Sequence, residues 1–286
     1  MGRFMKILLV KRLECSFFAF RQSIDRFLKT YDIFIEAFHK GTVHTSKSHT
    51  SRVLDFLENN DDESIQQLID EGKVETFKSH DFRKEFIENL DHDKKILIQI
   101  KELWKDIDRD PKLSTFIEEL KSDPVLKKNH IIIFTESKET AGYLFENINK
   151  QFTGEVMRFD GSSQSVDRDK VIRNFDAKSR NPDSKYRILI TTEVLSEGVN
   201  LHRSNVVINY DIPWNPTRLM QRVGRINRVD TKFKTIHTYN FFPSVQGDSH
   251  IALKSAAEIK IASFLSLLGD DAALLTDGEP IDSHAL

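Results

Sequence analysis

Residues 130–150 read HIIIFTESKETAGYLFENINK, and this stretch decides the expected fold. A short apolar run is followed at once by a segment with helical spacing, for which Thr135 or Ser137 would serve as the N-terminal cap. The same alternation recurs downstream, where GEVMRFD, YRILITT, SNVVINYD and TIHTYNF read as strands and SVDRDKVIRNF reads as a helix. Short apolar strands that alternate with helices predict an α/β fold with a parallel sheet and crossover helices.

The sequence before this α/β region predicts a mostly helical region. Apolar residues recur at three- and four-residue steps from Leu9 to Phe38, and Gly41 ends that pattern. Residues 42–52 are polar and read as a loop, and a second helical pattern occupies residues 82–104. We therefore expect a helical region at 1–124, the α/β domain at 125–245, and a C-terminal helix and tail at 246–286.

Composition excludes several classes of protein. The 42 lysines and arginines are balanced by 44 acidic residues, which argues against a wholly electrostatic partner of nucleic acid but leaves room for a local basic groove. Cys15 is the single cysteine, so no disulfide can form within the chain, and the ten histidines show no metal-ligand spacing. No apolar run approaches 18 residues and no secretory signal is present, so we expect a cytoplasmic protein without membrane contact.

The segment QRVGRINR, residues 221–228, places three arginines at three-residue steps around one glycine. Arginine is always charged and can hold phosphate oxygens two at a time. Arg225 and Arg228 would lie on one side of a helical turn, with Val223 and Ile226 anchoring the opposite side, and the glycine would allow a close approach. The segment could therefore clamp a polyphosphate. The alternative from these eight residues is a surface helix with a solvated basic face.

Four segments in this order resemble one known family. HIIIFTES, RFDGSSQSVDR, TTEVLSEGVNL and QRVGRINR together resemble the second, C-terminal motor lobe of superfamily-2 helicases, specifically the Swi/Snf-like branch. The resemblance covers residues 125–245 and extends in part to residues 6–40. It does not place residues 42–120, beyond the helical protrusions that such proteins carry. It implies a RecA-like parallel sheet and an ATP-dependent helicase or translocase.

The resemblance also implies roles in ATP binding. Arg225 and Arg228 match the arginines that reach the γ-phosphate of ATP, where they would neutralise charge that develops during phosphoryl transfer. Gln221 matches the polar residue that couples this motif to the partner lobe. Gly198, which lies in a tight turn, is also assigned to ATP binding. Glu193 matches an acid near the ribose, and an ordinary helix cap is an equal alternative for it.

Contacts to the nucleic-acid backbone are implied at the strand ends. Hydroxyl and amide groups there would hold phosphates without reading bases. For Thr135 and Ser137 the alternative role is a helix cap, and for Gly161 the alternative is a tight turn. The residues so assigned are Thr135, Ser137, Gly161, Thr191 and Thr192.

The sequence lacks a phosphate-binding loop, because its single Gly-Lys pair, Gly72-Lys73, is followed by valine. We therefore expect ATP and Mg²⁺ to be bound mainly by an N-terminal RecA-like lobe outside this chain. The chain would then be part of a longer or split protein, inactive alone, with that lobe and nucleic acid as partners and DNA expected rather than RNA. Two alternatives stay open: a non-catalytic binding module on a helicase-lobe scaffold, and a small-molecule α/β enzyme or dinucleotide binder.

Overall fold

The computed structural model describes residues 3–45, 75–195, 199–213, 215, 217–227 and 231–251. The chain divides into two compact units, Met1–Lys112 and Leu113–Leu286, and each is described by itself. The boundaries expected at residues 124 and 245 stay predictions. Among the described residues, no helix has both the length and the apolar character needed to cross a membrane.

The first unit begins with two helices where the sequence pattern predicted one. Helix α1 (Arg3–Cys15) ends before Ser16, and α2 (Phe17–His39) begins after it. Ser16 has an extended backbone, with φ of −163° and ψ of 150°, and its hydroxyl oxygen accepts a hydrogen bond of 3.0 Å from the Ala19 amide. The prediction of a continuous helix is wrong because this serine acts as an N-cap, which a count of apolar residues cannot detect.

A small antiparallel pair and a third long helix complete the first unit. Strands β1 (Thr42–Thr45) and β2 (Glu75–Lys78) pair with each other, and a 3₁₀ turn (Ser79–Asp81) leads toward α5 (Lys84–Leu103). The predicted loop at residues 42–52 is therefore wrong for its first four residues, where Thr-Val-His-Thr is rich in β-branched side chains. The remainder of that predicted loop, residues 46–52, lies outside the described residues.

Apolar side chains of α1, α2 and α5 form the core of this unit. Leu9, Ile24 and Leu97 are buried, one from each helix. The Trp104 ring packs edge-on against Phe17 and Phe20, with centroid distances of 4.8 and 4.9 Å. The helical region expected from the sequence thus has a hydrophobic core of its own.

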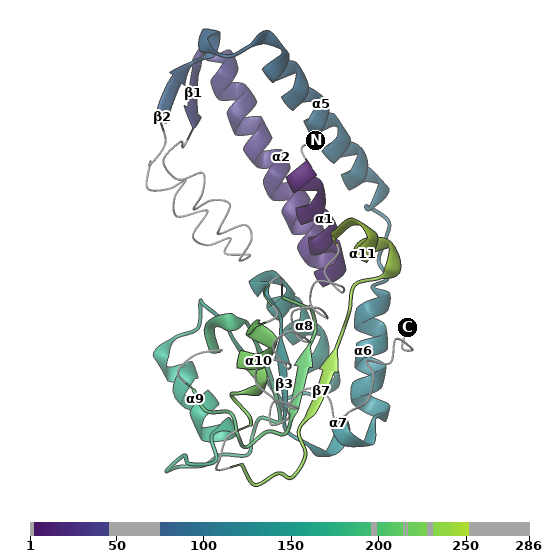
Figure 1. The fold of residues 1–286 in the computed structure, drawn as a ribbon, viewed down its shortest axis with the longest axis vertical. Coiled ribbons are helices and arrows are strands. Elements are labelled where there is room, and N and C mark those ends of the chain that lie inside the picture. The colour runs from purple at the N-terminus through teal and green to yellow at the C-terminus, as the bar shows by residue number, and fades with distance from the viewer. Residues whose placement is uncertain are drawn as a thin grey trace, which may run out of the picture. The chain divides into compact units, whose positions relative to one another are not determined.

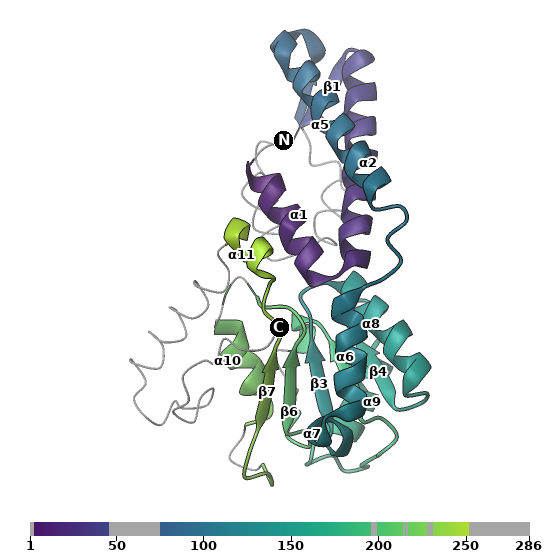
Figure 2. The same cartoon turned by 90° about the vertical axis from the view of Figure 1, so that its right-hand side faces the viewer.

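The second unit contains a five-stranded parallel sheet in the order β4-β5-β3-β6-β7 (Figures 1 and 2). All five strands lie where the sequence predicted them, so the expected α/β fold with a parallel sheet and flanking helices is confirmed. The elements are α6 (Pro111–Ser122), α7 (Pro124–Lys128), β3 (Ile131–Phe134), α8 (Lys138–Gln151), β4 (Val156–Phe159), α9 (Ser165–Phe175), β5 (Ile188–Thr191), a 3₁₀ turn (Glu193–Leu195), β6 (Val206–Asn209), α10 (Thr217–Val223), β7 (His237–Asn240) and α11 (Val245–Ile251).

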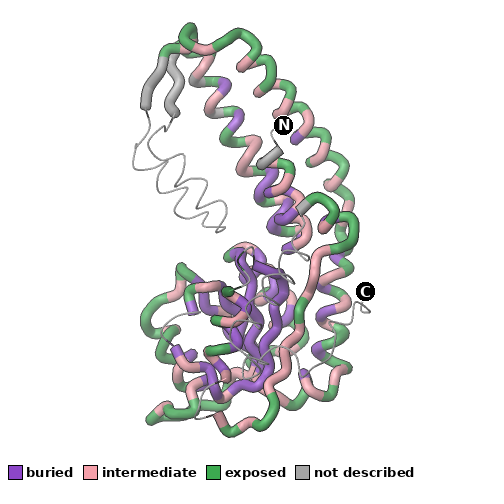
Figure 3. Tube along the Cα trace, viewed as in Figure 1, coloured by how far each residue is buried: buried purple, intermediate pink, exposed green. Residues whose placement is uncertain are grey.

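The sheet is buried on both faces, which explains why its central strands are continuous apolar runs (Figure 3). Ile131 and Ile133 of β3 pack in one cluster with side chains of α6, α7 and α8. Ile132 and Phe134 point the other way, into a cluster with α9 and the end of α10. Because the strands are parallel, their carboxyl ends meet at one edge of the sheet, where ligands bind in such folds.

Candidate functional site

Buried polar residues follow the strands at this carboxyl edge. They come after β3, at the end of β5 and beyond it, and at the end of β6 and beyond it, so the topology brings segments distant in sequence together. Buried polar groups need hydrogen-bond partners, so this cluster has to bond internally or to a ligand. Its buried members are Thr135, Glu136, Ser137, Thr191, Thr192, Asn209 and Asp211.

Arg222 of α10 lies at the centre of the polar cluster and is fully buried. Its Nε donates to Glu193 Oε1 at 2.8 Å, its Nη2 donates to the same oxygen, and its Nη1 donates to Asn209 Oδ1 at 2.8 Å. The guanidinium lies over the Phe134 ring, 5.1 Å from the centroid. The first arginine of QRVGRINR is therefore engaged inside the protein, and it ties α10 to the ends of β3 and β6 and to the turn after β5.

Asp211 forms a second junction at the same edge. Its Oδ2 accepts a hydrogen bond from the Thr135 hydroxyl, and its Oδ1 accepts one of 2.8 Å from the Glu136 amide. The Glu136 carboxylate is itself buried and lies 3.6 Å from Nη1 of Arg218, in the first turn of α10. The loop after β3, the loop after β6 and the start of α10 are thus held together by charged groups.

A sequence signal for these two junctions lies at the end of the fourth predicted strand. The segment NYDIPWNPTR follows the strand predicted at SNVVINYD, and it includes both Asn209 and Asp211, to which the sequence patterns assign no role. Both are polar residues at the end of an apolar strand, where burial of a polar group without a hydrogen-bond partner is unfavourable. Polar residues at the end of a buried strand are therefore candidates for structural junctions as well as for ligand contacts.

The apolar residues within QRVGRINR behave as predicted. Val223 and Ile226 are 2% and 0% exposed, and both belong to the cluster on the α10 face of the sheet. At Gly224 an added Cβ would lie 3.2 Å from the carbonyl oxygen of Met220. The close approach that the glycine allows is therefore to the backbone of its own preceding turn.

Arg225 is half-buried and follows α10 in a turn. Its amide donates to the Arg222 carbonyl at 3.2 Å, and its own carbonyl accepts from the Leu201 amide at 3.0 Å. Gln221, one turn earlier, is exposed. Arg228 lies outside the described residues, so its predicted role stays a prediction, as do those of Arg225 and Gln221.

The other residues assigned to ATP are placed as follows. Glu193 is the first residue of the 3₁₀ turn after β5, and its Oε1 is occupied by Arg222, with the side chain 21% exposed. Contact between Glu193 and a ribose stays a prediction. Gly198 lies outside the described residues.

Among the residues assigned to nucleic acid, the hydroxyl groups of Thr135, Ser137 and Thr191 already have partners. Ser137 caps α8, because its oxygen accepts from the Thr140 amide at 3.2 Å, and so it is the cap that the sequence left open. The Thr135 hydroxyl bonds to Asp211, and the Thr191 hydroxyl donates to the Thr192 carbonyl at 3.1 Å. Gly161 is exposed, in the turn after β4. A phosphate contact through the two threonine hydroxyls would require an exchange of these bonds.

Ser137→Ala is expected to destabilise the second unit by about 1 kcal/mol, because the Thr140 amide would lose its acceptor at a buried position. For a domain of this size the melting temperature should fall by about 2–4 °C. Ser122→Ala is the matched control, since that serine is an exposed residue at the end of α6. Thermal melts followed by circular dichroism would contradict the assignment if both variants unfolded at the wild-type temperature.

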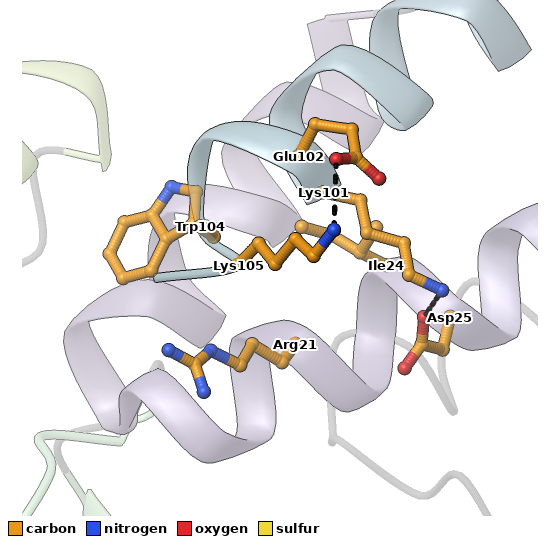
Figure 4. Close-up of a pocket in the computed structure, with 7 residues that line it drawn as sticks. All are labelled: Arg21, Ile24, Asp25, Lys101, Glu102, Trp104 and Lys105. Carbon is orange, nitrogen blue, oxygen red and sulfur yellow. Dashed lines mark ion pairs between the residues drawn. The ribbon is translucent and has the colours of Figure 1, made fainter. Parts of the chain in front are cut away.

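A cavity of about 230 Å³ lies in the first unit, between α2 and the end of α5 (Figure 4). Two of its cations are neutralised locally: Lys101 pairs with Asp25 at 2.7 Å, and Lys105 lies 3.8 Å from Glu102. Arg21 donates to the Ile107 carbonyl. These pairings leave little net charge to attract an anion. In the described part of the chain, no group of three or more His, Cys, Asp or Glu residues could hold a metal ion.

The decisive comparison concerns the segment that carries this polar cluster. Residues 111–230 match the family model of the helicase conserved C-terminal domain. This segment is therefore similar to the helicase conserved C-terminal domain. It runs from α6 through QRVGRINR, and the match confirms the expected C-terminal lobe of a superfamily-2 helicase with a RecA-like sheet.

Two curated proteins are similar in sequence to parts of this chain. The chain is 34% identical over 172 residues to the "Uncharacterized ATP-dependent helicase YqhH" of Bacillus subtilis (strain 168), covering 59% of this chain and 29% of the relative. It is 32% identical over 135 residues to the "ATP-dependent RNA helicase DBP5" of Kluyveromyces lactis, covering 45% and 27%. The chain thus spans less than a third of the length of these relatives.

Two solved structures resemble part of the chain. The C-terminal part of the Fun30 ATPase domain is 21% identical, with a TM-score of 0.42, covering 56% of this chain and 55% of the other. The C-terminal domain of the DEAD-box protein Dbp5 is 24% identical, with a TM-score of 0.41, covering 56% and 79%.

Proposed function

We propose that this chain is the C-terminal lobe of an ATP-dependent nucleic-acid helicase or translocase. In this proposal Arg225 and Arg228 act on ATP that is bound mainly by an N-terminal RecA-like lobe outside the chain. The observation that carries the proposal is the internal anchoring of Arg222, which fixes α10 and the turn that bears Arg225. A finger works only if its guanidinium is held in place before the reaction begins.

The residues of the turn fit a γ-phosphate. Arg225 is permanently charged and half-buried, and both its amide and its carbonyl are hydrogen-bonded, so its backbone is constrained. Bound ATP with Mg²⁺ would supply the phosphoryl group that is transferred to water. Arg225 and Arg228 would bind the γ-phosphate oxygens and neutralise the charge that develops on them. The exposed Gln221 would contact the N-terminal lobe.

Nucleic acid would bind along the carboxyl edge of the sheet through backbone contacts near Gly161 and Thr192. We propose DNA as the track, because the motifs resemble the Swi/Snf-like branch. RNA is the second candidate, since a 32%-identical relative is by name an ATP-dependent RNA helicase. A non-catalytic module on the same scaffold is the alternative from a different class.

The test is steady-state ATP turnover of the chain alone and of the chain joined to an N-terminal RecA-like lobe from a helicase such as the Bacillus subtilis relative. The chain alone should stay at background, because its sequence has no phosphate-binding loop. The joined protein should hydrolyse ATP and should be stimulated by DNA. Stimulation by RNA alone would support the second candidate. A folded joined protein without turnover would support the non-catalytic module.

A further inference from the structure

A separate pocket of about 270 Å³ lies in the second unit and is unrelated to the residues assigned above. Three segments build it: the one between α9 and β5, the one that leads into β6, and the one that leads into β7. All three precede their strands, so the pocket belongs to the edge of the sheet where the strands begin. Its volume is below the about 300–1,000 Å³ of pockets for drug-sized ligands, which favours a small occupant.

His202 lines this pocket and is almost fully buried, with its side chain 2% exposed. Within the described residues neither of its ring nitrogens has a hydrogen-bond partner. Its Nδ1 lies 3.7 Å from Asp176 Oδ1, which is beyond hydrogen-bond distance but close enough for the carboxylate to orient the ring. A buried imidazole without partners is costly, so the pocket favours an occupant that bonds to it.

The charges around His202 specify the sign of that occupant. Arg203 is fixed beside it, because Nη1 donates to the Asp183 carbonyl and Nη2 donates to the Ser184 hydroxyl at 2.9 Å. Lys232 is exposed and lines the same pocket from the segment before β7. These two permanent cations face one carboxylate, that of Asp176, so an anion is favoured.

We propose that this pocket binds the phosphate group of a small molecule, with His202 as a hydrogen-bond donor and Lys232 and Arg203 supplying positive charge. Asp176 lies nearest to Nδ1, so in the imidazolium form, in which both ring nitrogens are donors, Nδ1–H faces Asp176 and Nε2–H faces a phosphate oxygen. Phosphate oxygens take charge-assisted hydrogen bonds from such groups. The half-buried Phe233 forms an apolar wall that shields these bonds from water. The occupant is either inorganic phosphate or a small phosphate ester, since both present the same oxygens.

The experiment is a titration of the full chain, labelled with ¹³C-histidine, with inorganic phosphate at constant ionic strength. The His202 ring resonance, assigned by its loss in His202→Gln, should shift and saturate. Adenosine monophosphate and adenosine form the second pair of probes. If the monophosphate binds more tightly than inorganic phosphate while adenosine has no effect, the occupant is an ester. If the two phosphates bind equally, the occupant is inorganic phosphate.

Lys232→Gln should weaken phosphate binding several-fold, whereas Lys234→Gln, at an exposed position two residues away, should leave it unchanged. Both lysines are exposed, so this comparison stands even if His202→Gln does not fold. Three results would overturn the proposal: no saturation up to about 10 mM phosphate, a range that detects a millimolar dissociation constant; equal weakening by the two lysine variants; or a shift caused by adenosine alone.

Discussion

In the joined two-lobe protein, Arg225→Ala is expected to lower ATP turnover by about 10³-fold or more, the range for removal of an arginine finger. The reason is electrostatic, because a charge that is already in place stabilises the phosphoryl oxygens without reorganisation. Arg228→Ala should have an effect of the same order. Arg225→Lys should fail nearly as badly, since an ammonium keeps the charge but loses the planar pair of donors.

The fold should survive these substitutions at Arg225. The backbone hydrogen bonds that Arg225 makes to Arg222 and Leu201 are kept in every variant. Its side chain is half-buried, so we expect a stability change within about 0.5–1 kcal/mol. Steady-state ATP turnover, with thermal melts as the folding control, measures both quantities. Alanine variants at 225 and 228 that keep near-wild-type turnover would show that these residues form a solvated basic face instead.

The central strands β3, β5 and β6 were predictable because each is buried on both sides of the sheet. A run such as Ile131–Phe134 has to be apolar at every position when helices cover both faces, and that pattern is legible without a structure. The first unit gave a weaker signal. There Ser16 divides one apolar pattern into two helices through a local hydrogen bond, and the strand at Thr42–Thr45 depends on a partner strand thirty or more positions away in sequence.

Within QRVGRINR the spacing alone could not assign different roles to the three arginines. Arg222 and Arg225 are equivalent in sequence terms, each arginine being three residues from the next. Their difference comes from Glu193 and Asn209, which lie 29 and 13 positions before Arg222 and are brought to it by the sheet. A guanidinium becomes internal or external according to such distant partners, so its role has to be read from the folded structure.

Arg222→Ala is expected to be the most destabilising single change at this edge, at about 3 kcal/mol. The substitution removes both Glu193 bonds, the Asn209 bond and the contact with the Phe134 ring, and it leaves a void at a fully buried position. Removal of one partner of a buried charge pair costs about 3–5 kcal/mol, and the 21% exposure of Glu193 places this case at the lower end. For a domain of this size the melting temperature should fall by about 6–12 °C.

Two matched variants separate the buried charge pair from general effects on α10. Gln221→Ala changes the exposed neighbour on the same helix and should cost no more than about 0.5 kcal/mol. Glu193→Gln keeps an oxygen that can accept from Arg222 but removes the negative charge. Its loss of stability should therefore lie between the losses caused by Arg222→Ala and Gln221→Ala. Thermal melts of the three variants rank their losses of stability. If Arg222→Ala had the same melting temperature as Gln221→Ala, the guanidinium would contribute nothing to the junction. The anchoring of the turn that bears Arg225 would then need another cause.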